Sequence, residues 1–246
     1  MQDVRHRGPG TRRFMISVTE IPALEIAPGY DGFAALASPG EEVGLLILSE
    51  MFGVTAAMKD AARDFARAGI STLVPNIFRR SSETGVFSYE GKDRERAQIR
   101  ADNLKPDAVC EDIELAIKAF RTRVPELRQV AALGHCIGGG FAATALTKTS
   151  LAAAISYYGF GISNLGGALA QLGKPAQLHY GLADPHIPLS EIEAVRTCAS
   201  GNSRIEIFEY PEAGHSFCNP HRPMFDKAQA QLARDRALSL LRNLNR

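Results

Sequence analysis

The sequence predicts an α/β fold in which a doubly wound, mostly parallel sheet carries helices on both faces. Short, continuously apolar segments alternate with amphipathic segments of helical period, as expected where strands are buried on both faces of a parallel sheet. The chain of 246 residues, 45% of them apolar, is also long enough to bury one large core. We expect a disordered basic arm over residues 1–14 and a single domain over residues 15–246.

The elements of this domain follow from the hydrophobic period and from the turn-forming residues. Strands are expected at residues 16–27, 33–38, 43–48, 71–75, 152–158, 176–181 and 204–210, the first two forming a hairpin. Helices are expected at residues 55–67, 107–123, 188–199 and 225–244. The polar stretch 77–105 is expected to cross the strand ends with one helix at 93–103, and residues 159–174 are expected to form a loop.

Charge and cysteine content exclude several classes of function. The formal net charge of +1 gives no general attraction for nucleic acid or an anionic membrane, and no apolar stretch of about 18 residues is present to span a bilayer. Four cysteines without CxxC spacing are too few for a disulfide framework, and His179, His186, His221 and Cys218 lack the spacing of metal ligands. We expect a cytoplasmic protein without metal or cofactor, a monomer or weak homodimer that binds a small molecule.

Residues 129–144 (QVAALGHCIGGGFAAT) indicate a buried strand, a sharp turn and the start of a helix. They contain Gly134-His135-Cys136-Ile137-Gly138, a cysteine version of the G-x-S-x-G elbow, in which the nucleophile sits on a strained turn between small residues. The N–H groups and dipole of the following helix favour an anion and should lower the pKa of the thiol. We expect Cys136 to be a nucleophile rather than one more buried small residue.

Two polar residues that follow later strands complete a predicted catalytic triad. Asp184 and His215 come after Cys136 in the order nucleophile, acid, histidine, which is the order of α/β-hydrolase triads. His215 is the expected base, oriented by Asp184, although each residue alone is equally compatible with an ordinary turn. The backbone N–H groups of Ile137 and Met51 are the expected oxyanion hole of an α/β-hydrolase fold, and a thiolester intermediate would be hydrolysed by water that His215 activates.

With these residues in place, the chain resembles the dienelactone hydrolases (carboxymethylenebutenolidases), small cysteine members of the α/β-hydrolases. The resemblance runs from about residue 16 to the C-terminus and rests on the segments SEMFGV (49–54), GHCIGG (134–139), YYG (157–159) and EAGHSF (212–217). It implies that Glu50 holds the resting thiol and takes its proton when substrate displaces it. It also implies that Arg80 grips a substrate carboxylate, and we expect Arg79, Tyr158 and Phe217 to contact substrate as well.

The chain also departs from the family pattern. Cys218-Asn219-Pro220 stands where well-known members place a second substrate-binding arginine, with Arg222 further on, and the sequence contains no tryptophan. We expect a cysteine hydrolase of lactones or activated esters, with dienelactone, hydrolysed to maleylacetate in the catabolism of aromatic compounds, as the leading substrate. A broad carboxylesterase or thioesterase, or a non-catalytic ligand-binding protein on the same scaffold, are the alternatives.

Overall fold

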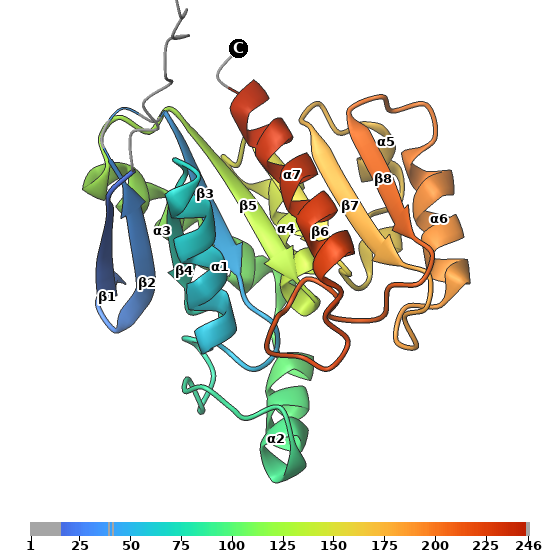
Figure 1. Cartoon of the computed structure of the whole chain (residues 1–246), viewed down its shortest axis with the longest axis horizontal. Coiled ribbons are helices and arrows are strands. Elements are labelled where there is room, and N and C mark those ends of the chain that lie inside the picture. Colours follow the sequence, from blue (N-terminus) through green and yellow to red (C-terminus); the bar gives the residue numbers. More distant parts are fainter. Residues whose placement is uncertain (1–15, 39, 41, 245–246) are drawn as a thin grey trace, which may run out of the picture.

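The described residues form one eight-stranded sheet at the centre of the fold (Figure 1). The structure is a computed structural model that describes residues 16–38, 40 and 42–244, and the arm expected at residues 1–14 lies outside them. The strands are β1 (Val18–Ala27), β2 (Tyr30–Ala37), β3 (Val43–Leu48), β4 (Ser71–Pro75), β5 (Gln129–His135), β6 (Ala153–Tyr157), β7 (Ala176–Gly181) and β8 (Ile205–Tyr210). Their order is β1-β2-β4-β3-β5-β6-β7-β8; β1 and β2 are antiparallel to each other, β2 is antiparallel to β4, and β3 to β8 are parallel.

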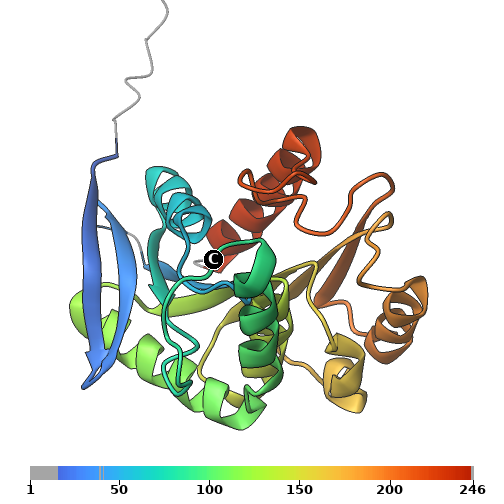
Figure 2. The same cartoon turned by 90° about the horizontal axis from the view of Figure 1, so that it is seen from below.

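Helices cover both faces of this sheet, which confirms the predicted fold class. They are α1 (Ala56–Arg67), α2 (Gly91–Asp102), α3 (Pro106–Arg123), α4 (Ile137–Lys148), α5 (Gly167–Ala170), α6 (Leu189–Ala199) and α7 (Lys227–Asn243). In Figure 2, α1 and α7 lie on one face, while α3, α4 and α6 lie on the other. Helix α2 extends beyond the carboxyl ends of the central strands (Figure 1). None of the helices in the described part of the chain is both long and apolar enough to cross a bilayer.

The two faces of the central strand β3 explain why its sequence is continuously apolar. All six of its residues are buried. Leu45 and Ile47 pack with residues of α1 on one face, whereas Leu46 and Leu48 pack with residues of α3 on the other. A strand between two helical layers needs apolar side chains in both directions, because successive side chains point to opposite faces.

The segment 159–174 differs from the sequence expectation of a loop. It contains a 3₁₀ helix at Ile162–Leu165 and the short helix α5. Each begins after a glycine with positive φ, Gly161 at 65° and Gly166 at 50°. Isolated helices this short leave almost no periodic signal in a sequence.

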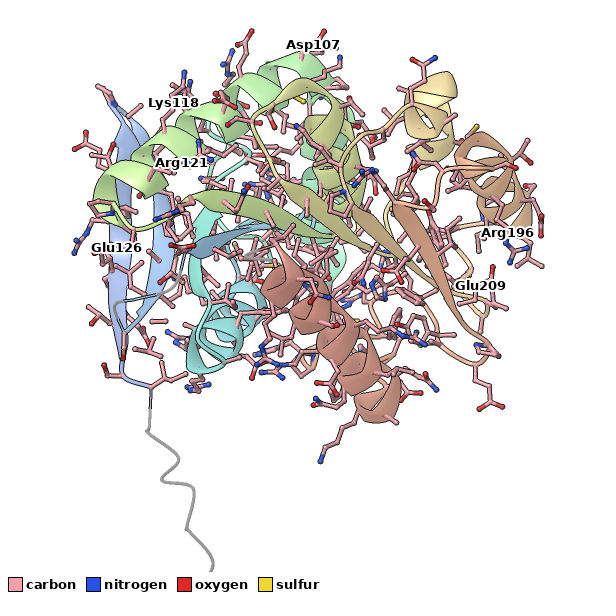
Figure 3. The ribbon with its side chains drawn as sticks, turned by 90° about the horizontal axis from the view of Figure 1, so that it is seen from above. Asp107, Lys118, Arg121, Glu126, Arg196 and Glu209 are labelled. Carbon is pink, nitrogen blue, oxygen red and sulfur yellow. The ribbon has the colours of Figure 1, made fainter. Side chains whose placement is uncertain are left out.

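Charged side chains lie on the outer surface of α3 and at one edge of the sheet (Figure 3). Figure 3 shows Lys118 on the outer side of α3, and it shows Arg196 of α6 beside Glu209 of the edge strand β8. Arg196 and Glu209 form an ion pair. Charged side chains on an edge strand oppose its pairing with another chain.

The predicted elbow is present between β5 and α4. Cys136 has φ 57° and ψ −123°, a backbone conformation that costs a non-glycine residue about 1–3 kcal/mol unless its surroundings hold it there. A Cβ on Gly134 would lie 1.9 Å from the carbonyl oxygen of Gly138, and a Cβ on Gly138 would lie 2.4 Å from that of Leu48. Both glycines of the motif are therefore required by close backbone packing.

We predict that Gly134→Ala lowers the free energy of unfolding by about 3 kcal/mol or more, because the methyl group meets the backbone of the elbow and the backbone must move to accommodate it. Denaturant unfolding measures this change. Gly167→Ala is the matched control, since a Cβ added at Gly167 would meet no atom within 4 Å. Equal stability of the two variants would contradict the packing argument.

Candidate active site

A cavity of about 400 Å³ lies at the carboxyl ends of the central strands. Its lining includes Cys136 at the elbow, His215 on the loop after β8, and Glu50 directly after β3. Helix α2 forms another part of the wall through Arg94, Gln98, Ala101 and Asp102. The cavity therefore combines the predicted catalytic groups with residues of the excursion between β4 and α3.

The backbone of Cys136 is fixed on both sides of the elbow. Its N–H donates to the carbonyl oxygen of Tyr157 at 3.0 Å, and its own carbonyl accepts from the N–H of Gly139 at 2.9 Å. Gly139 belongs to the first turn of α4, so the first hydrogen bond of the helix also anchors the nucleophile. The side chain is thereby held at the end of the sheet, facing the cavity.

His215 and Asp184 are brought together as the sequence predicted. His215 Nδ1 donates to Asp184 Oδ2 at 2.7 Å, and the other carboxylate oxygen accepts from the N–H groups of His186 at 2.8 Å and Ile187 at 3.3 Å. Because an ionised carboxylate only accepts hydrogen bonds, the proton lies on Nδ1 and Nε2 is left to act as a base. One oxygen of Asp184 therefore closes a local turn, and the other orients His215.

The thiol differs from the expectation that the dipole of α4 lowers its pKa, whereas a thiol that is neutral at rest is what the family resemblance implies. Burial raises the pKa of Cys136 well above its ordinary value, and the carboxylates of Glu50 and Asp184 raise it further. A hydrogen bond from the N–H of Ile137 and the charge of Arg222 lower the pKa but do not outweigh these effects. The dipole of α4 therefore does not make a resting thiolate, and the thiol is neutral near pH 7.

Glu50 is buried in the wall of the cavity, with 2% of its surface exposed. Burial raises the pKa of its carboxyl, while a hydrogen bond from Asn219 and the charges of His215 and Arg222 lower it. Asn219 Nδ2 lies 3.2 Å from each carboxylate oxygen, and Asn219 Oδ1 accepts from the N–H of His221 at 2.9 Å. Sequence reasoning missed this role of Asn219, although it noted that the turn after His215 departs from the family pattern.

The structure does not bring Arg79 and Arg80 to the cavity, so their expected place at the substrate needs correction. Arg79 Nε lies 2.8 Å from Asp112 Oδ1, and Arg80 Nη2 lies 2.9 Å from Asp112 Oδ1 and 2.9 Å from Glu111 Oε2. The guanidinium of Arg79 also stacks on Tyr30 at 4.8 Å. Asp112 is buried on α3, and an unpaired buried carboxylate is costly, which explains why it holds both arginines.

Tyr158 and Phe217 are also placed differently from the expectation. Both are fully buried beneath the site rather than in the lining of the cavity. The hydroxyl of Tyr158 is 2.8 Å from His135 Nδ1, its ring packs edge-on against His215 at 5.0 Å, and Phe217 packs against Tyr158 at 5.6 Å. Tyr158 therefore packs against His215, and Phe217 packs against Tyr158 in turn.

Two other arginines occupy the cavity wall. Arg94 lies on α2, and Arg222 follows the turn after His215, with its guanidinium over Tyr89 at 4.6 Å. Neither forms an ion pair with any carboxylate in the described part of the chain. The helical spacing of Arg94, Gln98 and Asp102 could have identified this wall, because residues four apart share one face of a helix.

Both residues expected to supply the oxyanion hole line the cavity. Ile137 is the first residue of α4, and Met51 lies in the loop after β3. The N–H of Ile137 is directed at the sulfur of Cys136. The site therefore brings together a thiol, an imidazole bonded to a carboxylate, a second carboxyl and two backbone segments, the set of groups that catalysis through a covalent intermediate requires.

Comparison with known proteins identifies the family of the chain. The model of the dienelactone hydrolase family matches residues 31–245. The chain is 26% identical over 227 residues to a carboxymethylenebutenolidase of Pseudomonas putida, covering 91% of this chain and 96% of that protein. It is 25% identical to a probable 2-oxo-3-(5-oxofuran-2-ylidene)propanoate lactonase of a Bradyrhizobium species, covering 87% and 90% of the two chains.

Solved structures show the same fold. A crystal structure of a putative dienelactone hydrolase from Klebsiella pneumoniae matches with a TM-score of 0.77 and 20% identity, covering 92% of this chain and 98% of that chain. A dienelactone hydrolase-like promiscuous phosphotriesterase from metagenomic libraries matches with a TM-score of 0.73 and 18% identity, covering 94% and 99%. By its sequence match and its fold, the chain belongs to the dienelactone hydrolase family of α/β-hydrolases.

Proposed function

We propose that the protein is a cysteine-dependent hydrolase of lactones and activated esters, with an unsaturated lactone that carries a carboxylate as its preferred substrate. The observation that carries this proposal is the joint placement of Cys136, on a strained elbow, and the His215–Asp184 pair at one cavity. Membership of a family of lactone hydrolases supports the reaction class. Dienelactone, opened to maleylacetate in the cytoplasmic catabolism of aromatic compounds, is the leading candidate.

The buried carboxyl of Glu50 accounts for activation of a thiol that is neutral at rest. Once Glu50 is ionised and released from Asn219, it accepts the thiol proton, and the thiolate sulfur attacks the carbonyl carbon of the lactone. The N–H groups of Ile137 and Met51 stabilise the oxyanion that forms. Collapse of this intermediate breaks the ring C–O bond, and the leaving oxygen takes the proton that Glu50 accepted, leaving a thiolester and an ionised Glu50.

Hydrolysis of the thiolester regenerates the enzyme. His215 Nε2 takes a proton from water, the hydroxide oxygen bonds to the carbonyl carbon, and the C–S bond then breaks. The sulfur leaves as thiolate and takes the proton from the His215 imidazolium, while the product departs as a carboxylic acid. Asp184 stabilises the imidazolium that forms in this step.

Arg94 and Arg222 are the proposed recognition groups for the substrate carboxylate. They carry positive charge into the cavity wall from two different segments, and a guanidinium pairs well with a carboxylate. The names of the Pseudomonas and Bradyrhizobium relatives both describe unsaturated lactones with an acidic side group, which supports an acidic substrate. A broad esterase is the second candidate, favoured by the neutral Asn219 beside Glu50 and by the engagement of Arg80 with Asp112.

We predict that Cys136→Ala lowers kcat by at least about 1,000-fold, because no other group can form the thiolester. Cys136→Ser is expected to remain poor, since a hydroxyl is much harder to deprotonate than a thiol. Steady-state hydrolysis of p-nitrophenyl acetate measures both. Cys198→Ala is the matched control, because Cys198 lies on α6 away from the cavity. Residual activity of Cys136→Ala above a few per cent would contradict the assignment of Cys136 as the nucleophile.

We predict that Arg94→Ala and Arg222→Ala each lower kcat/KM for dienelactone by about 10- to 100-fold, since a charge-assisted hydrogen bond is worth about 1.5–3 kcal/mol. Their kcat/KM for neutral p-nitrophenyl acetate should change little. Arg80→Ala is the control and should keep the preference for the acidic lactone. A wild-type enzyme that hydrolyses the neutral ester equally well would establish the broad esterase instead.

We predict opposite effects of Glu50→Gln on two reactions of Cys136. The Glu50 carboxylate raises the pKa of the thiol, so the variant should lower that pKa and shift alkylation by iodoacetamide to lower pH. Ester hydrolysis should nevertheless slow by about 100-fold, because the acceptor of the thiol proton is lost. Mass spectrometry of the Cys136 peptide across pH follows alkylation. Hydrolysis at the wild-type rate would exclude Glu50 as the proton acceptor.

A further inference from the structure

Arg100 is a buried arginine of α2 that joins two segments of the active-site region. Only 4% of its surface is exposed. Its Nη1 donates to the carbonyl oxygens of Glu83 at 3.0 Å and Gly85 at 2.7 Å, and its Nη2 donates to the carbonyl oxygen of Met51 at 2.6 Å. The guanidinium thus ties the excursion after β4 to the loop after β3.

Two aromatic rings flank the guanidinium of Arg100, and the charge of Glu83 also acts on it. Its guanidinium lies 3.8 Å from the ring centre of Phe78 and 4.4 Å from that of Phe87, and no ion pair joins it to a carboxylate in the described part of the chain. Burial lowers the pKa of Arg100 to about 10, so it remains charged near pH 7. Burying a cation without a counter-ion is costly. Hydrogen bonds between backbone groups could close the loop without this cost. A buried arginine at this position therefore calls for a specific role.

The loop that Arg100 contacts carries both Glu50 and Met51. Its other carbonyl groups are also engaged: Gly53 N–H donates to Glu50 at 3.2 Å, Phe87 N–H to Phe52 at 3.0 Å, and Thr55 N–H to Gly53 at 2.8 Å. The three hydrogen bonds just named are donated by backbone N–H groups, whereas the hydrogen bond to the carbonyl oxygen of Met51 is donated by the side chain of Arg100. This hydrogen bond fixes the carbonyl group of Met51, the residue whose N–H is proposed for the oxyanion hole.

We infer that Arg100 is a positioning residue that holds the Met51 segment in place to receive the oxyanion and keeps it in register with the α2 wall of the cavity. The inference rests on the proposed function, since it requires that an oxyanion forms beside Met51. The planar guanidinium reaches three carbonyls at once and fits between two rings, whereas a lysine ammonium cannot reproduce this geometry. Arg100→Lys therefore keeps the charge and removes the clamp.

The test compares two reactions of Cys136 in Arg100→Lys. Hydrolysis of p-nitrophenyl acetate forms an oxyanion, whereas alkylation by iodoacetamide needs the thiolate alone. We expect kcat to fall by about 10- to 100-fold with KM changed less than about threefold, while the rate of alkylation at Cys136 stays at the wild-type value. Arg96→Lys is the matched control, because Arg96 lies one turn earlier on α2, stacks on Phe87 at 4.6 Å and is half-exposed.

Wild-type kcat in Arg100→Lys would overturn the inference, and so would an equal loss in hydrolysis and alkylation, which would indicate general disruption of the site. Thermal unfolding of both variants checks that they are folded; should Arg100→Lys unfold, Arg100→Gln, which keeps an amide donor, is measured in the same two reactions. Cys136→Ala, measured beside them, distinguishes failure of the proposed function from failure of the role of Arg100. Activity in Cys136→Ala rejects the proposed function. An inactive Cys136→Ala together with an unaffected Arg100→Lys rejects only the role of Arg100.

Discussion

The close approach of β3, β5 and α4 at the elbow determines the rest of the active site. A Cβ on Gly134 would meet the backbone of Gly138, and a Cβ on Gly138 would meet the backbone of Leu48. The start of α4 therefore rests directly on the end of β3. That contact holds Cys136 in its strained conformation and places Glu50, two residues after Leu48, beside the nucleophile. One packing constraint therefore fixes both the nucleophile and the carboxyl that raises its pKa.

Burial has the largest effect on the pKa of the charged groups at the site. Glu50 is held by the neutral amide of Asn219, and Arg100 is held by backbone carbonyls. Neutral partners orient a charged group but compensate its lost hydration only in part, so the pKa of each shifts toward the neutral form. The thiol of Cys136 is affected in the same way. A thiol that is neutral at rest reacts slowly with alkylating and oxidising agents, because the thiolate is the reactive form.

Much of the fold and the central part of the site could be predicted from the sequence, because both depend on local patterns. Continuous apolar strands, a G-x-C-x-G turn and the order of Cys136, Asp184 and His215 are all readable along the chain. The positions of Arg79 and Arg80 were wrong for a physical reason: both follow β4, but a buried carboxylate on α3, Asp112, draws their side chains away from the cavity. No local pattern reports such a long-range pair.

The parts of the cavity that were hardest to predict are the side chains that come from outside the sheet. Cys136, His215 and Glu50 come from ends of sheet strands, whose positions are set by hydrogen bonding across the sheet. Arg94 and Gln98 come from α2, a helix with two buried residues and little apolar surface, and Arg222 comes from a turn. Because few core contacts constrain them, these residues can change without loss of the fold. Arg100 limits that freedom, because the same helix that presents the variable wall also holds the Met51 loop by a side-chain clamp. The residues of α2 that line the cavity are therefore free to vary, whereas the face that carries Arg100 is tied to the loop after β3.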